Sequence, residues 1–183
     1  MRNAITLIGG LVVGVGLGLL LIGFFTKADS PQLSESLVQS GSTAPLALDA
    51  PAPDFELETL NGELLGLEGL RGQVVLLNFW ATWCAPCKLE MPAFQNRYEQ
   101  HAGQLRVVAI NFDEPRDTVQ NFINDLGLTF DVLLDPGAEV QALYQVRGYP
   151  TSVIIDAEGI VRAIHIGLMT ETQLDNYLSE LGL

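Results

Sequence analysis

The chain has 183 residues, with 9 Lys and Arg against 22 Asp and Glu, and a formal net charge of −13. Such an acidic chain offers no basic stripe for phosphate groups, so nucleic acid is excluded as a partner. Its 2 cysteines are too few for a disulfide scaffold or a four-thiolate zinc site, and its 2 histidines stand alone in the sequence. We therefore expect a folded domain with neither a metal nor a cofactor.

The first segment of the chain predicts a membrane span, because residues 4–25 carry no charged side chain. As a helix this stretch would be about 33 Å long, enough to cross a hydrocarbon layer of about 30 Å. We interpret residues 1–28 as an uncleaved signal anchor, with a cleaved signal peptide as the alternative. Arg2 favours a cytoplasmic N-terminus. The rest of the chain would then lie on the extracytoplasmic side of the cell membrane, attached by this single span.

Residues 29–53 predict a flexible linker between the anchor and the folded part of the chain. The stretch is rich in serine and proline and shows no sustained hydrophobic periodicity. A flexible coil of this length would hold its ends on the order of 25–30 Å apart. A domain on such a linker could reorient against a partner in the membrane.

Residues 54–183 predict an α/β domain in which strands alternate with helices. Asn61-Gly62, between expected strands at 54–58 and 63–65, favours a type I′ hairpin turn. The apolar run from Val74 to Trp80 is typical of a central strand that is buried on both faces. The segment 85–101 predicts a helix that is kinked or interrupted at Pro92.

The second half of this domain continues the alternation. Strand–helix–strand units followed by a hairpin and a final helix predict a mixed sheet covered on both faces. The expected strands are 107–112, 132–134, 152–156 and 160–166, and the expected helices begin after Pro115, near Ala138 and after a capping box at Thr170.

Both cysteines lie in Trp83-Cys84-Ala85-Pro86-Cys87, after the most apolar strand and at the expected start of a helix. A helix N-terminus presents unpaired N–H groups and a partial positive charge, which favour a thiolate. Thiol–disulfide exchange requires that thiolate. We therefore predict a redox-active Cys84–Cys87 disulfide, with Cys84 as the exposed attacking sulfur and Cys87 as the resolving one. A structural disulfide and one half of a metal site are the alternatives, and the latter would need two further ligands.

Two motifs carry a resemblance to a known family. Residues 79–87 resemble the active-site segment of the thioredoxin superfamily, and Lys88-Leu89-Glu90-Met91-Pro92 resembles its membrane-anchored TlpA/ResA branch. Val146-Arg147-Gly148-Tyr149-Pro150-Thr151 resembles the cis-proline loop of the same superfamily. The resemblance covers about residues 51–183. It implies a thioredoxin-like three-layer fold, with a mixed central sheet, helices on both faces and the transmembrane helix ahead of it.

The resemblance also implies roles for single residues. Cys84 would be the nucleophile and Cys87 the resolving thiol. Pro150 would follow a cis bond and pack against the cysteine pair, and the backbone beside it would pair with the substrate chain. Trp83, Tyr149 and Pro150 would thus form the substrate-binding surface.

A carboxyl group near the cysteines is the open question of the mechanism. Many thioredoxins carry an Asp in the strand before the cysteine pair, whereas this chain has Asn78, which does not titrate near neutral pH. Glu90 follows Cys87 by three residues and shares roughly the same helix face. We hypothesise that Glu90 is partly desolvated, has a raised pKa and exchanges protons with Cys87. The alternative is a solvated Glu that the helix dipole favours.

The function we expect is a thiol–disulfide oxidoreductase that acts on protein disulfides, as a reductase. It would receive electrons from a membrane thiol carrier and pass them to apocytochrome c, in cytochrome c maturation, or to another exported protein. A peroxiredoxin-like thiol peroxidase is the second candidate, although Leu77 and Ala81 stand where such enzymes have Pro and Thr. A non-catalytic tethered binding module is the third. The direction of electron flow stays open, because a few kcal/mol can reverse it.

Overall fold

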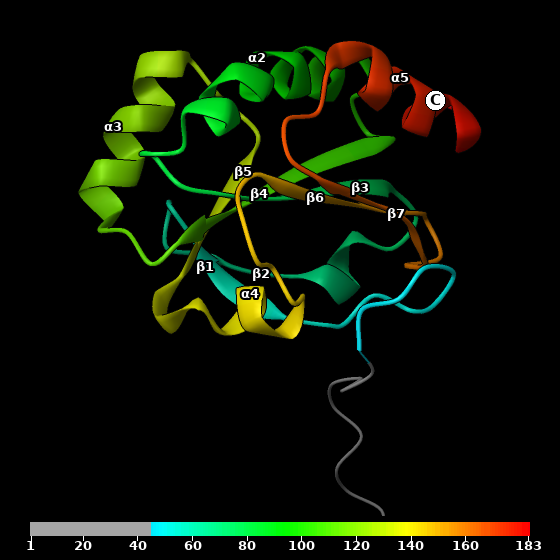
Figure 1. Cartoon of the computed structure of the whole chain (residues 1–183), viewed down its shortest axis with the longest axis horizontal. Coiled ribbons are helices and arrows are strands. Elements are labelled where there is room, and N and C mark those ends of the chain that lie inside the picture. The colour runs from blue at the N-terminus through cyan, green and yellow to red at the C-terminus, as the bar shows by residue number, and fades with distance from the viewer. Residues whose placement is uncertain (1–44) are drawn as a thin grey trace, which may run out of the picture. The chain divides into compact units, whose positions relative to one another are not determined.

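The computed structural model describes residues 45–183, which form one sheet with helices around it (Figure 1). The expected anchor at 1–28 and most of the expected linker lie outside these residues. Within 45–183, none of the helices is both long and apolar enough to cross a bilayer. The elements are β1 (Glu56–Thr59), β2 (Leu64–Gly66), η1 (Leu67–Leu70), β3 (Val74–Trp80), α2 (Ala85–Gln100), β4 (Leu105–Phe112), α3 (Arg116–Leu126), β5 (Asp131–Asp135), η2 (Pro136–Ala138), α4 (Glu139–Leu143), β6 (Thr151–Ile155), β7 (Val161–Ile166) and α5 (Glu171–Glu180).

The sheet is mixed, as the sequence predicted. Its strand order is β2-β1-β5-β4-β3-β6-β7. The central strands β3, β4 and β5 run parallel, while β6 and β7 on one side and β1 and β2 on the other are antiparallel to their neighbours. Crossover helices join the parallel strands, which is the connection that parallel neighbours require.

Helices cover both faces of this sheet. Figure 1 shows α2, α3 and α5 on one face and α4 with η1 on the other. All residues of β3 are buried, because its alternate side chains enter two different cores. Leu76 and Trp80 belong to the core beneath α2, whereas Leu77 and Phe79 belong to the core on the α4 side. The continuous apolar run of the sequence reflects this burial on both faces.

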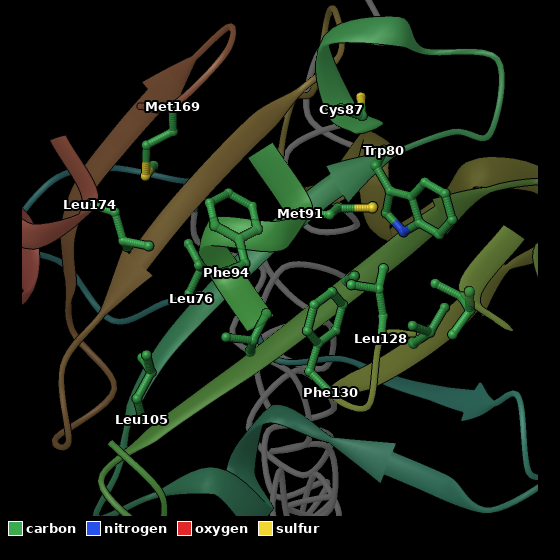
Figure 2. Close-up of a cluster of buried hydrophobic side chains, with 14 of the residues drawn as sticks. Leu76, Trp80, Cys87, Met91, Phe94, Leu105, Leu128, Phe130, Met169 and Leu174 are labelled. Carbon is green, nitrogen blue, oxygen red and sulfur yellow. The ribbon is translucent and has the colours of Figure 1, made fainter. Parts of the chain in front are cut away.

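The core beneath α2 anchors the helix that carries the cysteines. Met91 and Phe94 of α2 are fully buried in it, and the side chain of Met91 points toward the indole of Trp80 in Figure 2. Trp80 in turn packs against Phe122 of α3, with 4.9 Å between ring centroids. Burying each side chain of this size contributes about 1.5–3 kcal/mol. This packing holds the start of α2 at the end of β3.

Two local predictions need correction. The hairpin between β1 and β2 is confirmed, but Gly62 is its only loop residue with positive φ, at 85°, so the expected type I′ turn is not formed. A type I′ turn requires positive φ at two successive residues, and Asn61 does not adopt it. At Pro92, where the sequence predicted a kink or an interruption, an interruption is wrong, because α2 is a single helix from Ala85 to Gln100 with Pro92 inside it; the kink stays a prediction. By contrast, the capping box of Thr170 and Gln173 is present at the start of α5.

Ordered contacts begin before Asp54, where the sequence set the start of the domain. The backbone N–H of Asp49 donates to Val161 O at 2.8 Å, and that of Ala52 donates to Gly159 O at 2.9 Å. The Asp49 carboxylate also pairs with Arg162 of β7 at 2.8 Å. The last residues of the expected linker are therefore attached to the β6–β7 hairpin.

Candidate active site

The cysteine pair lies in the turn between β3 and α2. Cys84 is the N-cap of α2, and its Sγ accepts a hydrogen bond from the backbone N–H of Cys87 at 3.2 Å. The two sulfurs are joined in a disulfide. Cys84 is 5% exposed and Cys87 is 0% exposed. The order of exposure agrees with Cys84 as the attacking sulfur, but Cys84 is far more covered in the disulfide form than the sequence led us to expect.

The position of Cys84 favours a negative sulfur once the disulfide is reduced. A thiolate at the N-cap faces the free N–H groups of the first helical turn and the positive end of the helix dipole. Pro86, in that first turn, has no N–H to leave unpaired. The turn therefore suits thiol–disulfide exchange better than a merely structural disulfide.

Glu90 is buried one helical turn beyond Cys87. It is 1% exposed, and its two carboxylate oxygens accept hydrogen bonds from Asn78 Nδ2 at 2.9 Å and from the backbone N–H of Met169 at 2.8 Å. Burial raises the pKa of Glu90 from 4.5 to about 7, against the lowering effect of the two hydrogen bonds. The solvated alternative for Glu90 was wrong, and its side chain is suited to take up and release a proton near neutral pH.

Asn78 has a role that the sequence did not reveal. Its Nδ2 donates to Glu90 and to Ser152 Oγ at 3.0 Å, while its buried Oδ1 has no partner among residues 45–183. An amide can donate through nitrogen or accept through oxygen. Asn78 can therefore pair with Glu90 in both states, donating to the carboxylate or, after rotation of the amide, accepting from the carboxylic acid.

Aromatic side chains from three segments pack together at Trp83 of the cysteine turn. Trp83 is 64% exposed and packs edge to face on Tyr149, with 5.6 Å between centroids. Phe112, at the end of β4, packs on the same Tyr149 at 5.4 Å. The structure thus brings together Trp83 and Tyr149, which the resemblance assigned to substrate binding. Phe112 was missed, because nothing in its local pattern distinguishes it from the rest of the strand.

The cis-proline loop lies at the same end of the sheet. The Tyr149–Pro150 peptide is cis, as the resemblance implied. Thr151 pairs with Phe79 near the end of β3, so Pro150 lies at the edge of the sheet from which the cysteine turn leaves. Pro150 is buried, whereas Gly148, two residues before it, is exposed.

A carboxylate that the sequence analysis also missed holds the cysteine turn through hydrogen bonds. Glu114 accepts from the backbone N–H of Thr82 at 2.7 Å and from its hydroxyl at 2.5 Å. A third donor to this carboxylate is Asn111 Nδ2, at 2.7 Å. Glu114 therefore fixes the residue two positions before Cys84. Glu114 lies in the loop after β4, and nothing in the sequence there indicates its contact with Thr82.

Comparison with known proteins identifies the family of the chain. Residues 48–164 match the model of the AhpC/TSA family. The chain belongs to the AhpC/TSA family. The thioredoxin-like protein YneN of Bacillus subtilis (strain 168) is 43% identical over 130 residues, which cover 69% of this chain and 76% of YneN. The thiol-disulfide oxidoreductase ResA of Geobacillus kaustophilus (strain HTA426) is 35% identical over 182 residues, which cover 99% of this chain and 94% of that protein.

Solved structures extend the likeness to the fold. A thiol:disulfide interchange protein of the thioredoxin family from Chlorobium tepidum TLS has a TM-score of 0.67 and 27% identity, covering 74% of this chain and 98% of the other. This AhpC/TSA family member therefore has the thioredoxin-like α/β fold that the resemblance implied. It is a thiol–disulfide oxidoreductase of the ResA type.

Proposed function

We propose that the chain is a membrane-anchored extracytoplasmic reductase of protein disulfides. The observation that carries the proposal is the juxtaposition of a cysteine pair at the start of α2 with the buried Glu90 one turn further on. A helix N-terminus favours the attacking thiolate, and a carboxyl group with a pKa of about 7 can move the second proton. The two features supply both steps of a disulfide reduction.

The first step begins from the reduced form of the enzyme. The Cys84 thiolate attacks one sulfur of a substrate disulfide, a new S–S bond forms, and the substrate's own S–S bond breaks. The sulfur that leaves carries the electron pair of the broken bond and takes a proton from water. The enzyme and the substrate are then joined by a mixed disulfide.

The second step releases the substrate. Glu90 accepts the proton of the Cys87 thiol, and the resulting thiolate attacks Cys84 Sγ. The bond between Cys84 and the substrate breaks, and the second substrate sulfur leaves as a thiolate. Two electrons have passed to the substrate, and the enzyme holds the Cys84–Cys87 disulfide that the structure contains. Asn78 can remain hydrogen-bonded to Glu90 before and after the proton moves.

Return to the dithiol form requires a reductant. We propose a thiol carrier in the membrane as the electron donor, and apocytochrome c as one candidate substrate, within cytochrome c maturation. The chain's net charge of −13 would attract basic partners. The expected anchor at 1–28 would keep the domain beside such a carrier.

Reduction of insulin disulfides by the full-length chain in detergent tests the activity. The wild type should accelerate precipitation of the insulin B chain, and Cys84→Ser should abolish the acceleration. Cys87→Ser should accumulate a mixed disulfide with the substrate, because the resolving thiol is missing. Equal rates with wild type and Cys84→Ser would contradict the proposal, and an inert cysteine pair would favour the binding module.

Two further measurements test on which side of the membrane the domain lies and in which direction electrons flow. In intact cells, a membrane-impermeant maleimide should label the reduced cysteine pair, and protection until lysis would contradict the extracytoplasmic side. A titration of the pair against glutathione gives its reduction potential, and a value far more oxidising than that of glutathione would contradict a reductase.

Peroxide consumption tests the second candidate function. Ala81 and Leu77, which stand where thiol peroxidases have Thr and Pro, are both 0% exposed, so neither presents a group to a peroxide near Cys84. We expect no turnover of hydrogen peroxide above that of Cys84→Ser.

A further inference from the structure

The rings of Trp83, Phe112 and Tyr149, which we call the aromatic wall, come from three separate segments of the chain. Tyr149 is the middle member, with a centroid distance of 5.6 Å to Trp83 and of 5.4 Å to Phe112. Trp83 is 64% exposed and Phe112 is 36% exposed, so the wall is open to solvent, and Trp83 directly precedes Cys84 in the chain. Its geometry depends on how Tyr149 is held.

A buried amide holds Tyr149. Gln141 of α4 is 2% exposed, and its Oε1 accepts a hydrogen bond from the Tyr149 hydroxyl. Its Nε2 is buried without a partner among residues 45–183. A buried amide with an unpaired donor costs stability, and an apolar side chain of the same volume would avoid that cost. Among residues 45–183, the bond from Tyr149 is therefore the one hydrogen bond that the Gln141 side chain makes.

The residues around Gln141 keep this contact rigid. The Asp135 carboxylate accepts from the backbone N–H groups of Val140 at 3.1 Å and of Gln141 at 3.0 Å, so it fixes the first turn of α4. Burial, together with the charge of Asp135, raises the pKa of Tyr149 to about 12. The hydroxyl is therefore a permanent donor over the pH range in which thiols exchange.

We propose that Gln141 is a positioning residue for substrate choice. It fixes Tyr149 between Trp83 and Phe112, and the aromatic wall so formed binds an aromatic or other large apolar side chain next to the attacked cysteine of a protein substrate. The hydroxyl of Tyr149 is engaged by Gln141, so the wall offers ring surface and little polar recognition. This inference rests on the proposed function, since it concerns the substrate of that same site.

The role of Gln141 makes a distinct kinetic prediction. Without its acceptor, the Tyr149 ring is free to turn away from Trp83, and the wall loses its middle member. The preference for a substrate that binds the wall should then fall. This fall should be larger, as a factor, than the fall in rate with a substrate that does not bind the wall. A residue that only supported the fold would lower both rates alike.

The test uses two peptides, each joined to glutathione through a mixed disulfide. One carries Phe next to its cysteine and the other carries Ser. With the full-length chain, we expect kcat/KM to favour the Phe peptide by about tenfold, as burial of one ring against the wall allows. Gln141→Met and Tyr149→Phe should each reduce this preference by about fivefold, and the double variant should lose no more than either single one, because both remove the same hydrogen bond.

Gln95→Met is the matched control. Gln95 is also a buried glutamine, 8% exposed, but it bonds to Glu99 and Thr129, away from the aromatic wall. It should leave the preference between the two peptides unchanged.

Each outcome of the test decides one point. Equal use of the two peptides by the wild type would overturn the role of the wall, and a preference that survives both Gln141→Met and Tyr149→Phe would overturn the role of Gln141. Should Gln141→Met fail to fold, Tyr149→Phe still decides the second point. Failure of the wild type to reduce either peptide would overturn the proposed function itself.

Discussion

The side-chain amide of Asn78 donates to the Glu90 carboxylate across 2.9 Å, and this bond joins the central strand to the active-site helix inside the core. The other oxygen of Glu90 accepts from the backbone N–H of Met169, just before α5. One buried carboxyl group thus links β3, α2 and the segment that leads into α5. Its protonation should affect both the chemistry and the stability of the protein.

Replacement of Glu90 by Gln should slow disulfide exchange, because an amide cannot accept the proton of Cys87. General acid–base groups typically contribute at least about 100-fold, so we expect a loss of that order in the rate of the resolving step near neutral pH. Stopped-flow measurement of the decay of the mixed disulfide gives this rate directly. The loss should shrink at alkaline pH, where hydroxide deprotonates Cys87 without help.

Glu99→Gln is the control on the same helix, because Glu99 is exposed and lies two turns beyond Glu90. It should leave the rate unchanged. If Glu90→Gln resolves the mixed disulfide as fast as Glu99→Gln, Glu90 is not the proton acceptor.

The raised pKa of Glu90 also predicts how stability depends on pH. Because burial raises the pKa from 4.5 to about 7, the folded state binds a proton over this interval more tightly than the unfolded state. The contribution of the Glu90 carboxyl group to the free energy of unfolding is therefore fully present at acidic pH and is lost as the pH rises through about 7. Between about pH 5 and about pH 8 the loss should be about 2.5 kcal/mol.

Urea unfolding at the two pH values measures this loss. The comparison is with Glu90→Gln, which has no proton to lose at this position and should show a smaller drop. Asp156 and Asp175 have pKa values lowered from 3.8, so they titrate below this window in the folded state. A drop of equal size in wild type and Glu90→Gln would contradict the raised pKa.

Much of the fold could be predicted because its signals are local or come from burial on both faces. The apolar run of β3 predicted a central strand, and Thr170 with Gln173 predicted the start of α5 through bonds within one turn of helix. The cysteine pair was found the same way, from a short motif at a strand–helix junction. The type I′ turn at Asn61 was wrong because loop length, which depends on the register of β1 against β2, overrides the dipeptide preference.

Contacts between distant segments could not be predicted. Glu114 follows β4 and Gln141 lies on α4, and each reaches the site only because the sheet order brings those segments beside the cysteine turn or the cis-proline loop. The raised pKa of Glu90 was predicted from its spacing to Cys87, but its cause, burial under the segment at Met169, depends on where α5 packs.

A second carboxylate beside Glu90 should be poorly tolerated. Asn78→Asp would bring two acidic groups within hydrogen-bond distance in a buried site, and like charges in that arrangement resist ionisation together. We expect a loss of about 2–4 kcal/mol in the free energy of unfolding at about pH 8, and a smaller loss at about pH 5, where one shared proton joins the pair. Denaturant unfolding at the two pH values measures both.

The reciprocal exchange provides the control for this change. Asn78→Asp combined with Glu90→Gln restores one acid and one amide across the same contact. The double variant should regain most of the stability at about pH 8. A double variant as unstable as Asn78→Asp alone would mean that the single substitution destabilises the protein for reasons other than its contact with Glu90.

Glu114 should control the order of the cysteine turn. Its carboxylate accepts the backbone N–H and the hydroxyl of Thr82, so Glu114→Ala leaves both donors without this partner. We expect a loss of about 1–3 kcal/mol in stability and faster hydrogen exchange at the Thr82 amide, because hydrogen bonds to a charged group are worth more than neutral ones. Glu63→Gln, an exposed carboxylate change on the β1–β2 hairpin, should affect neither. Exchange at Thr82 as slow in Glu114→Ala as in the wild type would show that the turn is ordered by its own backbone and the disulfide, without the carboxylate.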